Sequence, residues 1–234
     1  MNRNTTIVIA VLAGGILAAV VAAWAVKSFT GSADTEQAMG TYRAQPLVGQ
    51  VLADNPAIAA ELRGAIEKDQ SDPQPGQSRV FDTIAKLRRT IIAPTVAAAD
   101  DASALAVMKA RIALVSNLQK HDIVACRQLA AAGIQDITKL DDEGQQLFRA
   151  TLSAMEAAYR NGKATGGKGA LPSAEEFRTM LQTAGFTEDD FAKLRDAATL
   201  NDSDFCQLEL RIDEAPDKLP EDKRAPFARF VIAH

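Results

Sequence analysis

The chain has 234 residues, of which 47% are hydrophobic and 24% are charged, and its net charge is −4. This composition is that of a globular protein, and the length suits one domain of about 150–200 residues or two smaller ones. Basic residues are scattered, apart from the pair Arg88-Arg89, which argues against a nucleic-acid-binding protein; we expect no nucleic-acid partner. Alanine is abundant and aromatic residues make up only 5%, which favours an all-α fold.

An uncharged apolar stretch runs from Ile7 to Val26. About 20 apolar residues in a helix span about 30 Å, the thickness of the hydrocarbon core of a bilayer. By the positive-inside rule, Arg3 keeps the N-terminus in the cytoplasm and the bulk of the chain is exported, although Lys27 weakens this asymmetry. The sequence therefore predicts a single-pass anchor in the inner (cytoplasmic) membrane. Its membrane residues include Ile7, Leu12, Leu17, Val21 and Trp24.

A cleaved signal peptide is the alternative interpretation of the same stretch. Ala23-Trp24-Ala25 has the small-residue pattern of a cleavage site, and cleavage after Ala25 would release the chain into the periplasm. Both interpretations place most of the chain outside the cytoplasm. If the segment is retained, Ala10, Gly14 and Ala18 are spaced so that two such helices could approach closely, which leaves a homo-oligomer open.

Beyond the anchor, the pattern of apolar residues predicts about eight helices. Asn55-Pro56 is typical of a helix start, Pro94 ends or kinks a later helix, and Asp100 or Asp101 caps the next. Asp141 or Asp142 then opens a helix that Gly162 ends. The predicted organisation is an anchor over 1–27, a stalk over 28–45, a helical unit over 46–161, a glycine-rich loop or linker over 162–172, and a C-terminal helical unit over 173–234 that packs on the first.

The C-terminal unit carries further helix signals. Ser173 with Glu176 forms a capping box, Thr187 caps the following helix, and Pro220 opens a last helix that Pro226 can kink. Residues 204–213 are less clear, because Cys206, Leu208, Leu210 and Ile212 alternate with polar residues as in a strand. A lone strand is not stable and no second convincing strand is present, so we predict a helix here and keep an extended segment as the alternative.

The only two cysteines of the chain are Cys126 and Cys206. Thiols outside the cytoplasm usually pair, so an exported chain predicts a disulfide between them. The alternatives are two buried free thiols or one reactive thiol. No C-x-x-C motif is present to favour the last of these.

The sequence contains few groups that could perform chemistry. His121 and His234 lack the spacing of a zinc site. Gly162 to Gly169 resembles a phosphate-binding loop, but a glycine stands where Ser or Thr must bind magnesium, and no strand precedes it. The sequence carries no serine-hydrolase motif, and we expect no catalytic residue, metal or cofactor.

The favoured hypothesis is therefore a non-catalytic, membrane-anchored helical interaction module, or scaffold, of the cell envelope, with an envelope protein as its partner. Two alternatives remain. The first is a cleaved periplasmic protein that binds a small apolar ligand between helices. The second is a tethered enzyme that uses dispersed carboxylates and His121.

Overall fold

The computed structural model of the protein describes residues 35–72, 78–131, 134, 137–166 and 171–233. Every regular element in these ranges is a helix, and no strand occurs in them, which confirms the predicted all-α fold. The predicted membrane segment, from Ile7 to Val26, lies outside the described residues and stays a prediction. Among the helices that are described, none is both long and apolar enough to cross a bilayer.

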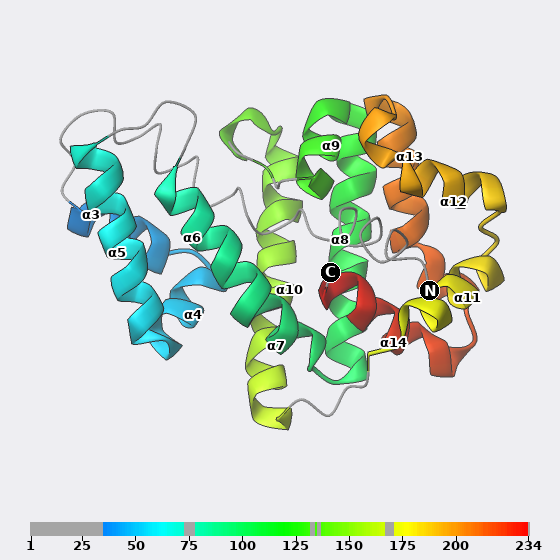
Figure 1. Ribbon diagram of the computed structural model, residues 1–234, viewed down its shortest axis with the longest axis horizontal. Coiled ribbons are helices and arrows are strands. Elements are labelled where there is room, and N and C mark those ends of the chain that lie inside the picture. Colours follow the sequence, from blue (N-terminus) through cyan, green and yellow to red (C-terminus); the bar gives the residue numbers. More distant parts are fainter. Residues whose placement is uncertain (1–34, 73–77, 132–133, 135–136, 167–170, 234) are drawn as a thin grey trace.

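The helices are more numerous than the eight or so that were predicted, since several are short. The first group is α3 (Thr35–Arg43), α4 (Val48–Asp54), α5 (Pro56–Ser71), α6 (Arg79–Leu87), the π-helical turn η1 (Arg88–Ile92) and α7 (Ala93–Ala97), of which α3 to α6 lie on the left of Figure 1. The central group is α8 (Asp101–His121), α9 (Ile123–Ala131), the 3₁₀ turn η2 (Ile137–Lys139) and α10 (Asp142–Thr165). The last group is α11 (Ala174–Thr183), α12 (Glu188–Arg195), the 3₁₀ turn η3 (Ala197–Thr199), α13 (Asp202–Asp213), the 3₁₀ turn η4 (Ala215–Lys218) and α14 (Glu221–Ala233).

Several predicted helix starts are confirmed at the level of the capping hydrogen bond. The side chains of Asp100 and Asp141 accept from the backbone N–H of the third residue of their helices. Ser173 and Thr187 each form a complete capping box, with Glu176 and Asp190 reaching back to the cap. These short-range signals could be identified from sequence because both partners lie within one turn.

The predicted stalk is wrong over its second half. Residues 35–43 form helix α3, and Ala38, Met39 and Tyr42 on one face of it are buried in the core. Burial of the Tyr42 side chain raises the pKa of its hydroxyl. The segment looks polar because only three of its nine residues face inward, too few to make a visible apolar pattern.

The predicted helix end at Gly162 is wrong, and of the two possibilities predicted for Pro94, an end or a kink, the end is wrong. Gly162 lies inside α10, which continues to Thr165 and ends at Gly166 in the left-handed conformation. Pro94 does not end the helix that precedes it, because the chain widens into the π-helical turn η1 just before it and continues as α7. At Gly162 the neighbouring helix α7 supplies the reason, because it leaves no room for a side chain at this position of α10.

Residues 204–213 belong to helix α13, so the helix prediction is confirmed and the extended alternative is wrong. The buried positions of α13 are Phe205, Cys206, Leu208, Glu209, Ile212 and Asp213, which follow a helical period rather than an alternating one. Two of these buried positions, Glu209 and Asp213, are acidic. Acidic residues are usually exposed, so the segment resembled a strand with alternating buried and exposed residues.

Helix α8 is the centre of the fold, because it contributes to two hydrophobic clusters. Val107, Leu114 and Leu118 pack into a cluster formed mainly by α3 to α10. Ala104 and Met108 pack into a second cluster formed with α11 to α14. Figure 1 shows α8 between the first group of helices and α11 to α13. The C-terminal helices therefore share a buried helix with the rest of the described chain.

We expect Gly162→Ala to destabilise the protein by about 2–3 kcal/mol, since overpacking a close helix contact forces backbone shifts. An added Cβ would collide with the carbonyl oxygen of Thr95 in α7. Gly64→Ala is the matched control, because Gly64 lies inside α5 with nothing within 4 Å of an added Cβ, and it should stabilise by about 0.5–1 kcal/mol. Urea unfolding of both variants measures the difference. Equal stabilities would contradict the close packing of α10 on α7.

Candidate functional site

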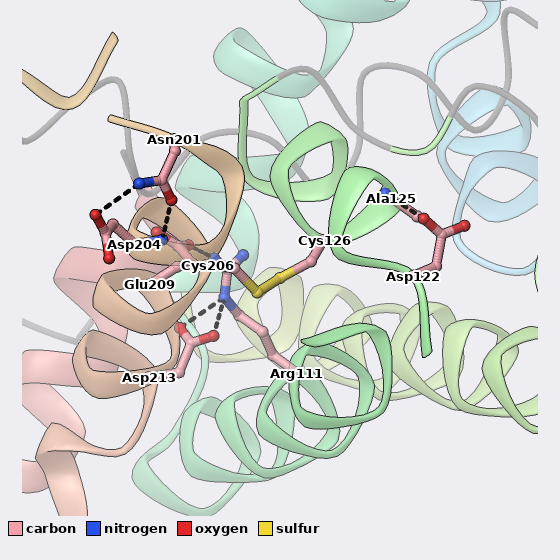
Figure 2. Close-up of a disulfide and its surroundings, with 9 residues drawn as sticks. All are labelled: Arg111, Asp122, Ala125, Cys126, Asn201, Asp204, Cys206, Glu209 and Asp213. Carbon is pink, nitrogen blue, oxygen red and sulfur yellow. Dashed lines mark hydrogen bonds and ion pairs between the residues drawn. A yellow bond between two sulfur atoms is a disulfide. The ribbon is translucent and has the colours of Figure 1, made fainter. Parts of the chain in front are cut away.

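The structure brings Cys126 of α9 and Cys206 of α13 together as a disulfide, with their Cα atoms 5.9 Å apart, as the sequence predicts. Both residues are fully buried. The bond closes a loop of 80 residues, which stabilises the fold by about 4 kcal/mol in the chain-entropy model. Figure 2 shows it where α13 lies against α9.

A buried cluster of charges lies beside the disulfide. The Nε–H group of Arg111, on α8, donates to both carboxylate oxygens of Asp213, at 2.6 and 2.8 Å. Another nitrogen of the same guanidinium forms an ion pair with Glu209. The side chains of Arg111, Glu209 and Asp213 are 2%, 1% and 0% exposed, so the cluster is closed to solvent.

One face of α13 carries both the disulfide and the charge cluster. Cys206, Glu209 and Asp213 are spaced by three and four residues, which places them one above another along the helix. This face meets α9 through Cys206 and α8 through the two carboxylates. The three residues therefore fix both the position and the register of α13 against the central helices (Figure 2).

The cluster holds more carboxylates than cations. Burial raises the pKa of Asp213 to about 6, while the guanidinium of Arg111 opposes this effect and the nearby Glu214 adds to it. One oxygen of Glu209 has no hydrogen-bond partner among the described residues. Two buried carboxylates sharing one guanidinium carry an excess negative charge, which favours the binding of a proton as the pH falls toward 6.

A second cation, Arg88, lies near this cluster at the start of the π-helical turn η1. Burial, together with the neighbouring guanidinium groups of Arg111 and Arg89, lowers the pKa of Arg88 to about 10. The group remains charged at neutral pH. Arg88 therefore adds positive potential to a region that also contains the excess carboxylate.

The charge cluster is a poor candidate for catalysis, since a substrate cannot reach groups that are this closed to solvent. His121, which the enzyme hypothesis uses, lies exposed at the end of α8. It is ten residues from Arg111, or about 15 Å along the helix. The structure thus does not bring His121 to the buried carboxylates. Among the described residues, no group of three or more His, Cys, Asp or Glu side chains is placed to hold a metal ion.

The open candidate site is a groove between α11 and α14, with a volume of about 430 Å³. Its size is within the usual range of ligand-binding clefts. Leu171 at its edge is 46% exposed, which is unusual for a large apolar side chain in the described part of this chain. The lining residues are Leu171, Pro172, Glu175, Glu176, Thr179, Met180, Lys223 and Pro226.

Sequence analysis identified the disulfide but neither the buried charges nor the groove. Arg111, Glu209 and Asp213 resemble ordinary surface residues of helices, and pairing across 102 residues leaves no local pattern. One signal was available, because a helical interpretation of 204–213 puts Glu209 and Asp213 on the face of Cys206. The sequence matches no protein-family model, and no curated protein or solved structure is significantly similar to it. Function must therefore be argued from geometry.

We expect Arg111→Met to destabilise the protein by about 3–5 kcal/mol, because it leaves two buried carboxylates without their cation. Replacing the whole cluster, in Arg111→Met with Glu209→Leu and Asp213→Leu, should recover most of that loss. Arg160→Met, which removes an exposed pair with Glu156, is the control and should change the stability by less than about 0.5 kcal/mol. Chemical denaturation of the three variants gives these values. A triple variant as unstable as Arg111→Met would contradict an electrostatic origin of the effect.

The raised pKa of Asp213 predicts a pH dependence of stability. An unfolded Asp loses its proton near pH 4, whereas Asp213 in the folded chain keeps it up to about pH 6. The folded state binds more protons between these values, so this group's contribution to stability is complete below pH 4 and is lost as the pH rises through 6. The charged groups around it are Arg111 on α8, Arg88 on η1, and Glu209 and Glu214 beside it on the chain.

Asp213→Asn should remove this dependence, because Asn imitates the protonated acid. We expect wild type and Asp213→Asn to have similar free energies of unfolding at pH 4. As the pH rises to 7, the free energy of unfolding of the variant should increase relative to that of wild type. Urea unfolding of both proteins at intervals of half a pH unit tests this. A constant difference across the range would show that Asp213 is ionised in the folded state throughout.

Proposed function

We propose that the protein is a non-catalytic interaction module of the cell envelope, held at the inner membrane by its N-terminal apolar segment, with the helical domain on the periplasmic side. The observation that carries this proposal is that the buried charge cluster is separate from an open groove with apolar residues. The ion cluster of Arg111, Glu209 and Asp213 is closed inside the domain, whereas the groove between α11 and α14 is open to solvent.

Two observations support the location. The apolar stretch from Ile7 to Val26 has the length of a membrane span. The pairing of Cys126 with Cys206 is typical of a protein that folds in an oxidising compartment outside the cytoplasm. The two observations support export independently, since the apolar stretch is a property of the sequence and the disulfide depends on the fold.

The second candidate function is that of a cleaved periplasmic protein that binds a small apolar ligand. The groove favours it in size and in its apolar residues Leu171, Met180 and Pro226. Small ligands, however, are usually enclosed over most of their surface. A groove with charged residues at its edge and an exposed Leu171 suits a larger partner better, so the interaction module is our first choice.

Site-specific photo-crosslinking of the full chain in its native membranes tests the proposal. A photoreactive residue at Thr179, in the groove, should give one discrete crosslinked product with an envelope protein. The same residue at Glu67, exposed on α5 in the opposite part of the fold, should give none. The absence of products from Thr179 and from further probes over the exposed surface would contradict an interaction module.

The intact mass of the protein isolated from those membranes separates the two candidates. A mass that includes the stretch from Ile7 to Val26 supports the anchored module. A mass that begins after Ala25 removes the anchor and makes the soluble ligand-binding protein the better candidate.

A further inference from the structure

One cysteine of the disulfide is placed by contacts within its own part of the chain. Cys126 lies in the first turn of α9, which follows α8 after the single residue Asp122. The carboxylate of Asp122 accepts from the backbone N–H of Ala125 at 2.9 Å, a bond drawn in Figure 2. The carbonyl oxygen of Asp122 accepts from the backbone N–H of Cys126 at 3.0 Å. These contacts fix Cys126 relative to the end of α8.

The other cysteine, Cys206, lies far along the chain on α13, so contacts between helices must place it. Arg127 of α9 holds the N-terminal end of α13. Its guanidinium donates to the carbonyl oxygen of Leu200 and forms an ion pair with Asp202 at 3.4 Å. The same group lies 4.9 Å from the centre of the Phe205 ring, which is a favourable cation–π distance.

Arg111 of α8 holds α13 on the other side of Cys206. It pairs with Glu209, one turn beyond the cysteine, and with Asp213, two turns beyond it. Cys206 thus lies between two arginine contacts along α13. Both are made by α8 and α9, the helices that fix Cys126, so the two sulfur atoms meet wherever these contacts form together.

The two arginine contacts differ in burial. The side chains of Arg127 and Asp202 are 25% and 41% exposed, so water can replace either partner, and exposed pairs contribute little. The contact of Arg111 is closed to solvent. A position of α13 that misses Arg111 leaves buried charges unpaired, which is strongly unfavourable. The Arg111 contact is therefore the one that rejects wrong positions of α13.

We propose that Arg111 is a positioning residue for disulfide formation: its ion pairs form in the reduced chain and dock α13 with Cys206 against Cys126. The cluster then precedes the disulfide, and the disulfide locks an arrangement that the charges have already selected.

Oxidation requires an external disulfide, for which glutathione disulfide serves as the probe. The thiolate of one cysteine attacks this oxidant, forms a mixed disulfide and releases one glutathione thiolate. The second cysteine attacks the cysteine sulfur of the mixed disulfide, which forms the bond between Cys126 and Cys206 and releases the second glutathione thiolate. The oxidant gains two electrons, and the two protons of the cysteine thiols pass to the released thiolates. Arg111 acts on the second step, which is intramolecular and depends on the position of α13.

The equilibrium constant of this exchange measures the effective concentration of the two thiols. The full chain in detergent micelles is equilibrated with mixtures of reduced and oxidised glutathione, quenched with acid and alkylated, and its free thiols are counted by mass. We expect Arg111→Lys to lower the effective concentration about tenfold, because Lys keeps the charge but lacks the rigid fork that holds two carboxylates. Arg111→Met should lower it at least as much, because both carboxylates lose their cation.

Two control variants separate positioning from stability. Arg127→Met removes the exposed contact beside Cys126 and should change the effective concentration less than about threefold. Gly162→Ala destabilises the contact of α10 with α7, away from α13, and should leave it unchanged. Circular dichroism of the reduced proteins reports whether they remain helical.

Three results would overturn the proposal. The first is an effective concentration in Arg111→Lys equal to that of wild type. The second is an equal fall in Gly162→Ala, which would show that pairing of the thiols follows overall stability. The third is a loss of helicity in reduced Arg111→Lys, since the fall would then result from unfolding.

Discussion

The ion pairs of Arg111 with Glu209 and Asp213 are the interaction on which the arrangement of the helices depends. They join α8, which is shared by both hydrophobic clusters, to α13, the helix that carries one half of the disulfide. Buried ion pairs contribute little net stability, because the desolvation of the charges offsets their attraction. Their larger effect is to disfavour alternative packing arrangements of the helices. A slip of α13 by one turn would leave a buried carboxylate without its cation and separate Cys206 from Cys126.

The disulfide and the charge cluster act on different states of the chain. The bond between Cys126 and Cys206 restricts the unfolded chain, since it closes a loop of 80 residues. The cluster acts in the folded state, where the two oxygens of Asp213 accept from a single nitrogen of Arg111 and allow one relative position of α8 and α13. The chain thus has one constraint that favours compact states and another that selects among them.

The features that were predictable from sequence are those whose partners lie within one turn, or whose chemistry leaves few choices. The capping boxes of Ser173 and Thr187 are of the first kind, and the pairing of the only two cysteines is of the second.

The errors arose where tertiary contacts decide the local structure or the burial of a residue. Gly162 usually signals a helix end, but here it lets α10 approach the backbone of α7. Glu209 resembles a surface acid, and only Arg111, far away in sequence, explains its burial. The groove depends on how α11 lies against α14, which no local pattern encodes.

The width of that groove is set by aromatic packing beneath it. The ring of Phe177 on α11 stacks on Phe227 and Phe230 of α14, with centroid distances of 4.7 and 4.1 Å. These rings are almost fully buried, so separating the helices would expose them to water. α14 is in turn held to the loop before α8, because Arg229 donates hydrogen bonds to the carbonyl oxygen of Ala99. The two helices that form the groove are therefore held at a fixed separation by buried rings, and the exposed Leu171 lies at the edge of the groove they form.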